Sequence, residues 1–283
     1  MWKQALWSVA RIVGGLSAGL AILILGCQER LIYFPRAYAP NTIRSFLKTG
    51  GRQIDFKTSC GGQTAFYLPP RRPATEKALP DHVWLVFGGN ATLALDLIDL
   101  AEQWNPRHGW LFIDYPSYGG CEGKPSPESI RENALAAVAA LERELDVSRE
   151  ELAPRLGAFG HSLGSAAALL AAEALGIRRI VLVSAFTSMD DLGRHLYKVP
   201  LSWINRHRFD NVARLKSVRQ RGARLHIFHG TDDEIVPFRM GRQLAATAPE
   251  IATFHAVRGA DHNGILMTAS AEIGAAINAL SGQ

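Results

Sequence analysis

The chain has 283 residues, of which 47% are hydrophobic and 20% are charged, and its net charge is +5. These proportions are typical of a globular protein, and no internal repeat or low-complexity run interrupts the sequence. The basic residues are scattered and form neither an arginine-rich helix nor an aromatic-basic platform, so we expect no nucleic-acid partner.

Residues 1–27 have the layout of an export signal. Lys3 and Arg11 give a positive start, an uncharged apolar stretch ends at Leu25, and Cys27 follows a glycine. This order is typical of a bacterial lipoprotein signal peptide, with Cys27 as the lipidated N-terminus. Two alternatives stay open, because the stretch is also about long enough for an uncleaved membrane anchor or for a buried helix. Either of the first two interpretations places the protein in the cell envelope, anchored to the membrane, with its catalytic domain outside the cytoplasm on the periplasmic side.

Residues 28–283 alternate strand patterns with helix patterns, which predicts a single α/β domain. We expect strands at 53–58, 63–68, 82–87, 109–113, 155–160, 179–183, 223–228 and 251–257. We expect helices at 91–104, 127–145, from 163 onward, 237–246 and 264–280. Strands that alternate with helices form a mostly parallel sheet with helices on both faces, and the opening hairpin adds antiparallel strands at one edge of these eight strands.

The stretch Gly160-His161-Ser162-Leu163-Gly164 follows an apolar strand and opens a helix rich in alanine and leucine. It fits the G-x-S-x-G nucleophile elbow. A serine on such a turn is exposed at the sheet edge, and the helix that follows directs its free N–H groups toward any anion formed there. We therefore predict that Ser162 is a catalytic nucleophile.

An elbow serine needs a base and an acid that orients the base. After the seventh predicted strand, residues 229–237 contain the candidates Asp232 and Asp233, and after the eighth comes His262. The order of serine, acid and histidine is that of α/β-hydrolases, so we predict that His262 is the base. We interpret His229 as a packing residue, and Asp114 as a carboxylate that holds its own loop.

Six sets of motifs together resemble the α/β-hydrolase superfamily. They are Asn90-Ala91, Asp114-Tyr115 with Tyr118-Gly119, Gly123-Lys124-Pro125-Ser126, the Ser162 elbow, His229-Gly230-Thr231 with Asp233, and Asp261-His262-Asn263. More narrowly, they are similar to the small membrane-anchored serine hydrolases that include eukaryotic protein depalmitoylases and bacterial lipoprotein-like members. The likeness extends from about Leu31 to the end of the chain.

The resemblance implies roles for further residues. It favours Asp233 over Asp232 as the acid, and it places the two N–H donors of the oxyanion hole at Leu163 and at Asn90, with Ala91 as the alternative to Asn90. The family usually has His-Gly-Asn where this chain has a glycine at position 88, which affects the loop rather than the backbone donor. It also implies that Cys60 and Cys121 lie near one strand end, so a disulfide between them and two free thiols are the alternatives.

Residues 186–221 predict a short cap whose apolar side chains form a lip over an open site or pack on the sheet edge. We expect a serine hydrolase that cleaves a small acyl ester or thioester, or an acylated protein, through an acyl-enzyme, with no metal and no cofactor. The alternatives are a peptidase or amidase of the same fold and a non-catalytic envelope binding protein.

Overall fold

The computed structural model describes residues 28–73, 79–198 and 205–282, together with isolated residues before Gln28. Apart from these isolated residues, the predicted signal peptide or anchor at residues 1–27, with its lipidation site Cys27, lies outside the described part. Within the described part, none of the helices combines the length and the apolar character that crossing a bilayer requires.

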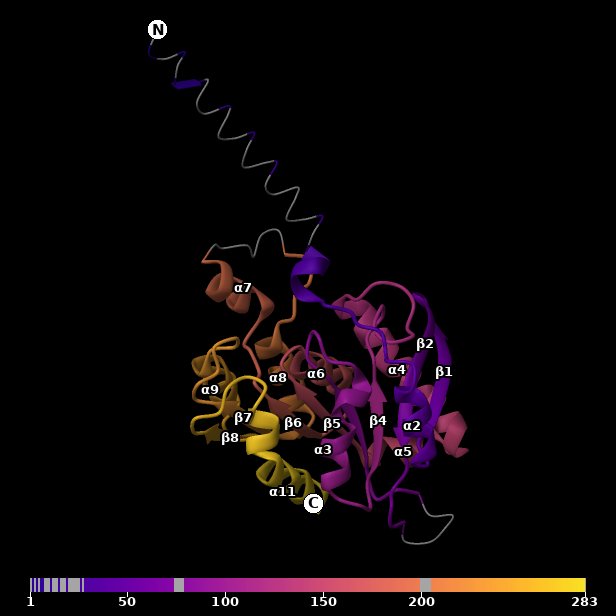
Figure 1. The fold of residues 1–283 in the computed structure, drawn as a ribbon. Coiled ribbons are helices and arrows are strands. Elements are labelled where there is room, and N and C mark those ends of the chain that lie inside the picture. Colours follow the sequence, from indigo (N-terminus) through magenta and orange to yellow (C-terminus); the bar gives the residue numbers. More distant parts are fainter. Residues whose placement is uncertain are drawn as a thin grey trace.

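Eight strands of the described residues form one sheet, in the order β1-β2-β4-β3-β5-β6-β7-β8 (Figure 1). They are β1 (Arg52–Thr58), β2 (Gly61–Leu68), β3 (Val83–Phe87), β4 (Gly109–Ile113), β5 (Leu156–His161), β6 (Arg179–Val183), β7 (Arg224–Gly230) and β8 (Ala252–Val257). The β1–β2 and β2–β4 pairs are antiparallel, and the other pairs are parallel. The predicted sheet is thereby confirmed, including the antiparallel hairpin at its edge.

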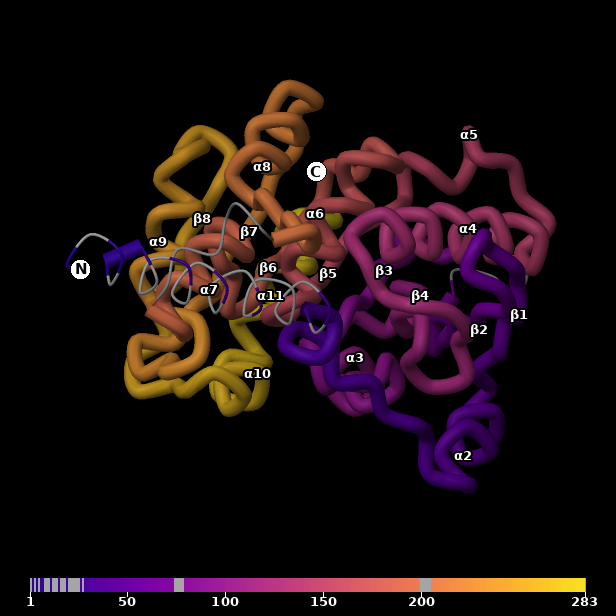
Figure 2. The backbone as a smooth tube through the Cα atoms, turned by 90° about the horizontal axis from the view of Figure 1, so that it is seen from above, coloured from indigo at the N-terminus to yellow at the C-terminus, as the bar shows by residue number. Residues whose placement is uncertain are grey.

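Helices cover both faces of this sheet. One layer consists of α4 (Pro127–Leu145), α6 (Leu163–Leu175), α8 (Asn211–Gln220) and α9 (Phe238–Ala246). The other consists of α2 (Thr42–Lys48), the 3-10 helix η1 (Ala94–Leu97), α3 (Ile98–Gln103), α10 (Ile265–Thr268) and α11 (Ser270–Ser281). Figure 2 shows the sheet between α4, α6 and α8 on one side and α2, α3 and α10 on the other. The short α5 (Arg149–Leu152) and η2 (Ala153–Arg155) precede β5, and α7 (Met189–Tyr197) follows β6.

The buried strands place alternate side chains into two separate cores. In β3, Leu85 and Phe87 pack with the α4 and α6 layer, whereas Trp84 and Val86 pack with the α3 and α11 layer. Every residue of β3 is buried, as expected for a central strand with helices on both faces.

Two predicted helices are shorter or interrupted, and four α-helices and the 3-10 helix η2 were not predicted. The expected helix at 91–104 becomes η1 and α3, because the Asp96 carboxylate accepts a hydrogen bond from Leu93 N and Asp114 accepts one from Ala94 N. The expected helix at 264–280 breaks at Ala269 into α10 and α11. No helix was expected at α2, α5, α7 or α8. Helices α7 and α8 lie within the predicted cap at 186–221, of which residues 199–204 are outside the described part.

Cys60 and Cys121 are free thiols, so of the two alternatives the disulfide is wrong. The Cys121 sulfur is buried against β2, where it lies 3.4 Å from Thr64 N and 3.6 Å from Thr64 O. Cys60 instead packs at the hairpin tip beside Gly123. The two loops do lie close together, but the buried sulfur faces the β2 backbone.

Candidate active site

The turn between β5 and α6 holds Ser162 in a strained conformation. Its φ of 56° and ψ of −119° lie where a non-glycine residue is rarely found. Ser162 N donates to Val183 O at 2.9 Å, which fixes the turn to β6. A Cβ at Gly160 would overlap the Gly164 carbonyl, and a Cβ at Gly164 would overlap the carbonyl of Phe87. Both glycines of the predicted elbow are therefore needed for this close backbone approach.

Ser162, His262 and Asp233 converge at the carboxyl ends of β5, β7 and β8. Ser162 Oγ lies 2.9 Å from His262 Nε2, and His262 Nδ1 lies 2.8 Å from Asp233 Oδ2 and 3.0 Å from Oδ1. With the Nδ1 proton on the carboxylate side, Nε2 is free to accept the serine proton. Asp232, the alternative acid, is exposed and accepts a hydrogen bond from Thr231 Oγ1 at 2.8 Å instead.

Asp233 is held as a carboxylate by two imidazoles, one of which the sequence analysis interpreted only as a packing residue. Burial alone would raise the pKa of Asp233, but hydrogen bonds from His229 and His262 outweigh burial and hold that pKa well below its usual range. His229 Nε2 lies 3.4 Å from Asp233 Oδ2 and 2.9 Å from Val236 O. The backbone N–H groups of Ile235 and Val236 also donate to Asp233 Oδ1, at 3.0 and 2.8 Å.

His161, inside the elbow, is a further contact that sequence analysis did not identify. His161 Nε2 lies 2.9 Å from the carbonyl oxygen of His262, so its N–H donates a hydrogen bond to that oxygen. This bond fixes the backbone that positions the imidazole of His262. Burial and the neighbouring His262 lower the pKa of His161 to about 4, which keeps its ring neutral at pH 7. The only sequence signal was its position before Ser162, and that position does not reveal a contact with a residue 101 positions away.

Asn90 and Leu163, the two residues expected to supply the oxyanion-hole N–H groups, both line the pocket at Ser162. Within the described residues neither N–H group has a hydrogen-bond partner. The loop before Asn90 is rigid despite the glycine at position 88, because Tyr115 Oη donates to Gly88 O at 2.6 Å and Tyr118 Oη donates to Asn90 O. Phe34 N donates to the carbonyl oxygen of Asn90 at 2.9 Å. This bond joins residues 33–41, which we call the N-terminal arm, to this loop.

A pocket of about 340 Å³ opens at Ser162, and most of its wall is apolar. One face of α7 forms a large part of that wall, through Met189, Leu192, Gly193, Leu196 and Tyr197. Leu31, Ile32, Phe186 and Ile235 complete the apolar lining from other segments. The Ser162 hydroxyl thus lies at a hydrophobic pocket of the size that small-molecule sites have.

Asp114 lies outside this group of residues. Tyr38 Oη donates to its carboxylate at 2.6 Å and Ala94 N donates at 2.8 Å, so it joins the N-terminal arm to η1 rather than holding its own loop. Burial raises the pKa of Asp114 to about 6, against the opposing effect of these hydrogen bonds.

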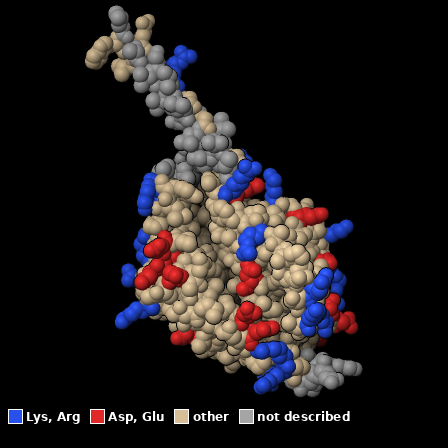
Figure 3. Space-filling view, viewed as in Figure 1, with Lys and Arg blue, Asp and Glu red and all other residues tan. Residues whose placement is uncertain are grey.

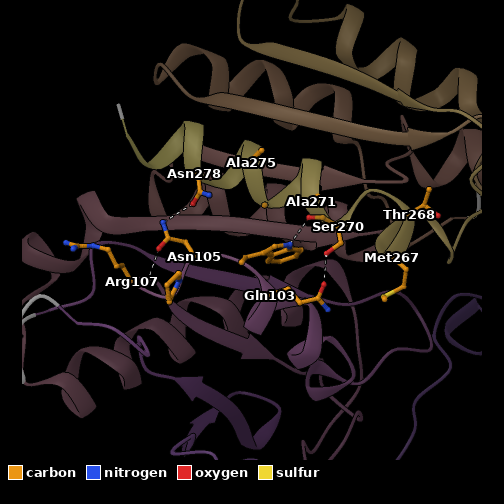
Figure 4. A pocket seen from close by; sticks show the side chains of 12 residues that line it. Gln103, Asn105, Arg107, Met267, Thr268, Ser270, Ala271, Ala275 and Asn278 are labelled. Carbon is orange, nitrogen blue, oxygen red and sulfur yellow. Dashed lines mark hydrogen bonds between the residues drawn. The ribbon is translucent and has the colours of Figure 1, made fainter.

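A second cavity of about 810 Å³ lies away from Ser162, between the end of α3 and α11 (Figure 4). Its amide and hydroxyl groups bind one another: Asn105 Nδ2 donates to Asn278 Oδ1 at 2.9 Å, and Trp104 Nε1 donates to Ser270 O at 2.9 Å. These bonds join α11 to the end of α3, and none of the described residues that line the cavity is an aspartate, glutamate, histidine or cysteine. Nowhere in the described part of the chain do three or more His, Cys, Asp or Glu side chains gather closely enough to share a metal ion.

No family model matches the sequence. It is 32% identical over 261 residues to the uncharacterized protein Rv2307c of Mycobacterium tuberculosis, covering 90% of this chain and 87% of that protein. The alpha/beta hydrolase domain-containing protein aho-3 of Caenorhabditis elegans is 26% identical over 204 residues, which is 69% of this chain and 57% of that protein.

Solved structures share the architecture at low sequence identity. The Pyrococcus furiosus esterase Pf2001 has a TM-score of 0.64 at 14% identity, covering 88% of this chain and 97% of that chain. Est1E from Butyrivibrio proteoclasticus has a TM-score of 0.63 at 15% identity, covering 82% and 99%. The chain therefore has the α/β-hydrolase fold.

Proposed function

We propose that this chain, which belongs to the same family as the mycobacterial protein Rv2307c and has the α/β-hydrolase fold, is a serine hydrolase that cleaves carboxylic esters or thioesters. The observation that supports this most directly is the 2.9 Å contact from Ser162 Oγ to His262 Nε2, with the opposite ring nitrogen 2.8 Å from the Asp233 carboxylate. A binding protein has no need for all three groups in this order.

In the proposed reaction Ser162 Oγ attacks the acyl carbon while His262 Nε2 takes the hydroxyl proton. The backbone N–H groups of Leu163 and Asn90 stabilise the oxyanion that forms. His262 then gives the proton to the departing alcohol or thiol, which leaves an acyl-enzyme. A water molecule, deprotonated by His262, attacks the acyl carbon, and the acid departs as Ser162 recovers its proton.

The pocket favours an acyl chain over a peptide. Its lining is mostly aliphatic, and within the described residues no acidic or basic side chain borders it except the histidines beside Ser162. Alcohol and thiol leaving groups also require less protonation than an amine, which favours esters and thioesters over the peptidase or amidase alternative. The similarity of the fold to Pf2001, an esterase, supports the same preference.

The first test is labelling with a fluorophosphonate probe, comparing the wild type with Ser162→Ala. We expect one covalent adduct on the wild type and none on the variant, because only an activated hydroxyl attacks phosphorus. Ser217→Ala, on α8, is the matched control and keeps full labelling. A folded wild type that takes no label would refute the proposal and favour the binding-protein alternative.

A series of p-nitrophenyl esters then measures the acyl pocket. Each CH₂ that the apolar wall buries contributes about 0.8 kcal/mol, so kcat/KM should rise about fourfold per carbon until the pocket is full. An unchanged kcat/KM from the shortest ester onward would show that the pocket does not hold the acyl chain.

We also propose that residues 1–27 place the protein in the cell envelope with its catalytic domain on the periplasmic side. The positive start, the apolar stretch and Cys27 support this proposal. The intact mass of the mature chain distinguishes the forms: cleavage before Cys27 with added acyl groups indicates a lipoprotein, and the full mass indicates an anchor. Accessibility to protease only after the outer membrane is opened is the expected result, and protection until cell lysis would contradict it.

A further inference from the structure

Helix α7 has two chemically different faces. Its apolar face, with Met189, Leu192 and Leu196, borders the pocket at Ser162. Its other face, with Asp191 and Arg194, borders a separate polar groove, which is also lined by Lys198 at the C-terminal cap of the helix. One helix turn carries 3.6 residues, so side chains three and four positions apart share a face, and these two sets lie on opposite sides of one helix.

The polar groove has a volume of about 490 Å³ and lies between α7 and α9. Arg194, His195 and Lys198 line it from α7, and Arg239 and Gln243 line it from α9. Figure 3 shows Lys and Arg side chains, with an acidic cluster beside them, on the left flank of the molecule, where Figure 1 shows α7 and α9. The groove thus brings three permanent cations and one imidazole together from two helices.

Among the described residues that line the groove, the one acidic side chain, Asp191, is already neutralised. The Asp191 carboxylate accepts hydrogen bonds from Thr187 Oγ1 at 2.7 Å and Ser188 Oγ at 2.9 Å, and it forms an ion pair with Arg194 at 3.3 Å. Within the described residues no acidic side chain forms an ion pair with Lys198 or Arg239. Residues 199–204, outside the described part, contain no Asp or Glu in their sequence. The groove therefore has an excess of positive charge that the protein leaves uncompensated.

The electrostatics of His195 agree with this excess. Desolvation, and then the positive charges of Lys198 and Arg239, lower the pKa of His195. Lys198 and Arg239 thus both lie close enough to His195 to repel its protonated imidazole. An anion between them would relieve that repulsion.

We propose that the groove between α7 and α9 is a binding site for a phosphate-bearing anion, distinct from the pocket at Ser162. Arg239 offers a planar guanidinium group suited to phosphate oxygens and Lys198 adds a point charge, whereas the Arg194 guanidinium already pairs with Asp191. Phosphate can come from a soluble metabolite or from a lipid headgroup.

The test measures direct binding to the full-length chain and does not depend on turnover at Ser162. Inorganic phosphate and octyl phosphate, which has a chain but no carboxylic ester, are titrated by calorimetry. Equal affinity for both assigns a soluble ligand, and octyl phosphate binding at least tenfold more tightly assigns a lipid headgroup. With either ligand, the proposal requires that the affinity for phosphate or octyl phosphate falls when the positive charges of the groove are removed.

The decisive variant is Lys198→Ala/Arg239→Ala. Each hydrogen bond from a charged donor is expected to change the affinity by about tenfold or more, so binding should weaken by about a hundredfold. The matched control, Lys216→Ala/Arg242→Ala, removes the same net charge from exposed positions that do not line the groove. Equal weakening in both double variants, or no binding of either probe by the wild type, would overturn the proposal.

Discussion

Histidines lie at both ends of the parallel strands, but among the described residues only those at the carboxyl ends include one, His262, that lies between a hydroxyl and a carboxylate. At the carboxyl ends, His262 contacts Ser162 on one ring nitrogen and Asp233 on the other. At the amino ends, His82 precedes β3 and His108 precedes β4. Their rings lie 5.3 Å apart at right angles, and His82 Nε2 binds Ser281 O at 2.9 Å.

His108 shows what burial does when no reactive group is near. It packs beside Trp84 and Trp110, and burial, followed by the nearby His82, lowers its pKa to about 4. The aspartate near it, Asp81, forms an ion pair with Arg107 instead of orienting a ring. A histidine in this fold becomes a candidate base only where a hydroxyl and a carboxylate lie on its two nitrogens.

The largest expected effect is on kcat, and it should distinguish the aspartate at the carboxyl ends of the strands from the aspartate at the amino ends. Replacing Asp233 by Asn leaves the geometry but removes the negative charge that fixes the Nδ1 proton, so we expect kcat for an ester to fall on the order of 10⁴-fold. Asp81→Asn and Asp232→Asn are the controls and should retain activity within about twofold, the scale of substitutions at exposed positions. A similar loss of kcat in Asp232→Asn would show that the assignment of Asp233 as the acid is wrong.

The second largest effect concerns stability, and here the two ends should behave alike. The folded-state pKa of His161 is about 4, below its unfolded value of 6.5, so the unfolded chain takes up the proton first as pH falls. The free energy of unfolding should therefore decrease between pH 6.5 and pH 4 by about 3 kcal/mol from this residue and then level off. Urea unfolding of the wild type and of His161→Gln across this range measures the difference.

His108 supplies the comparison for that measurement. Its lowered pKa predicts a decrease in the same pH window, so His108→Gln should also flatten the profile, without loss of esterase activity. A wild-type stability that stays constant from pH 7 to pH 4 would show that both rings are solvated.

Much of this architecture could be predicted, because the strands are short apolar runs between glycines, prolines and polar turns. β4 and β6 have the predicted limits, and α4 begins at the predicted Pro127, after Ser126 accepts a hydrogen bond from Ser129 N at 3.1 Å. The short α2 was not predicted, because seven residues with one buried side chain, Phe46, form no clear helical pattern.

The contacts around the nucleophile could be predicted only in part. The motif and the chain order indicated Ser162 and His262, since these depend on local turns. The choice between Asp232 and Asp233 required the path of the loop after β7, and the second imidazole on the acid required the turn that brings His229 back to Asp233. Long-range placement of this kind has no local pattern in the sequence.

The third prediction concerns that second imidazole. His229→Leu removes a donor from the Asp233 carboxylate and leaves Val236 O without its partner. One hydrogen bond to a charged group contributes about 1.5 kcal/mol, so kcat should fall about tenfold while KM changes little. His229→Gln, which can still donate, should restore most of kcat. His108→Leu is the matched change at the other end, and a comparable loss of kcat there would show that the effect is only structural.

The smallest expected effect tests whether the pocket at the carboxyl ends of the strands alone sets the preferred length of the acyl chain. Gly193 lies on α7 at the pocket wall, and a Cβ built there meets nothing within 4 Å, so Gly193→Leu fills open space without strain. Because leucine also favours a helix over glycine by roughly 0.8 kcal/mol, stability should not decrease. We expect kcat/KM for short p-nitrophenyl esters to change less than about threefold, while the optimum moves to shorter chains, since each CH₂ excluded forfeits about fourfold. Ala275→Leu, in the groove of Figure 4, is the control and should leave the series unchanged. An optimum that stays in place in Gly193→Leu would mean that the acyl chain leaves Ser162 along another path than the apolar face of α7.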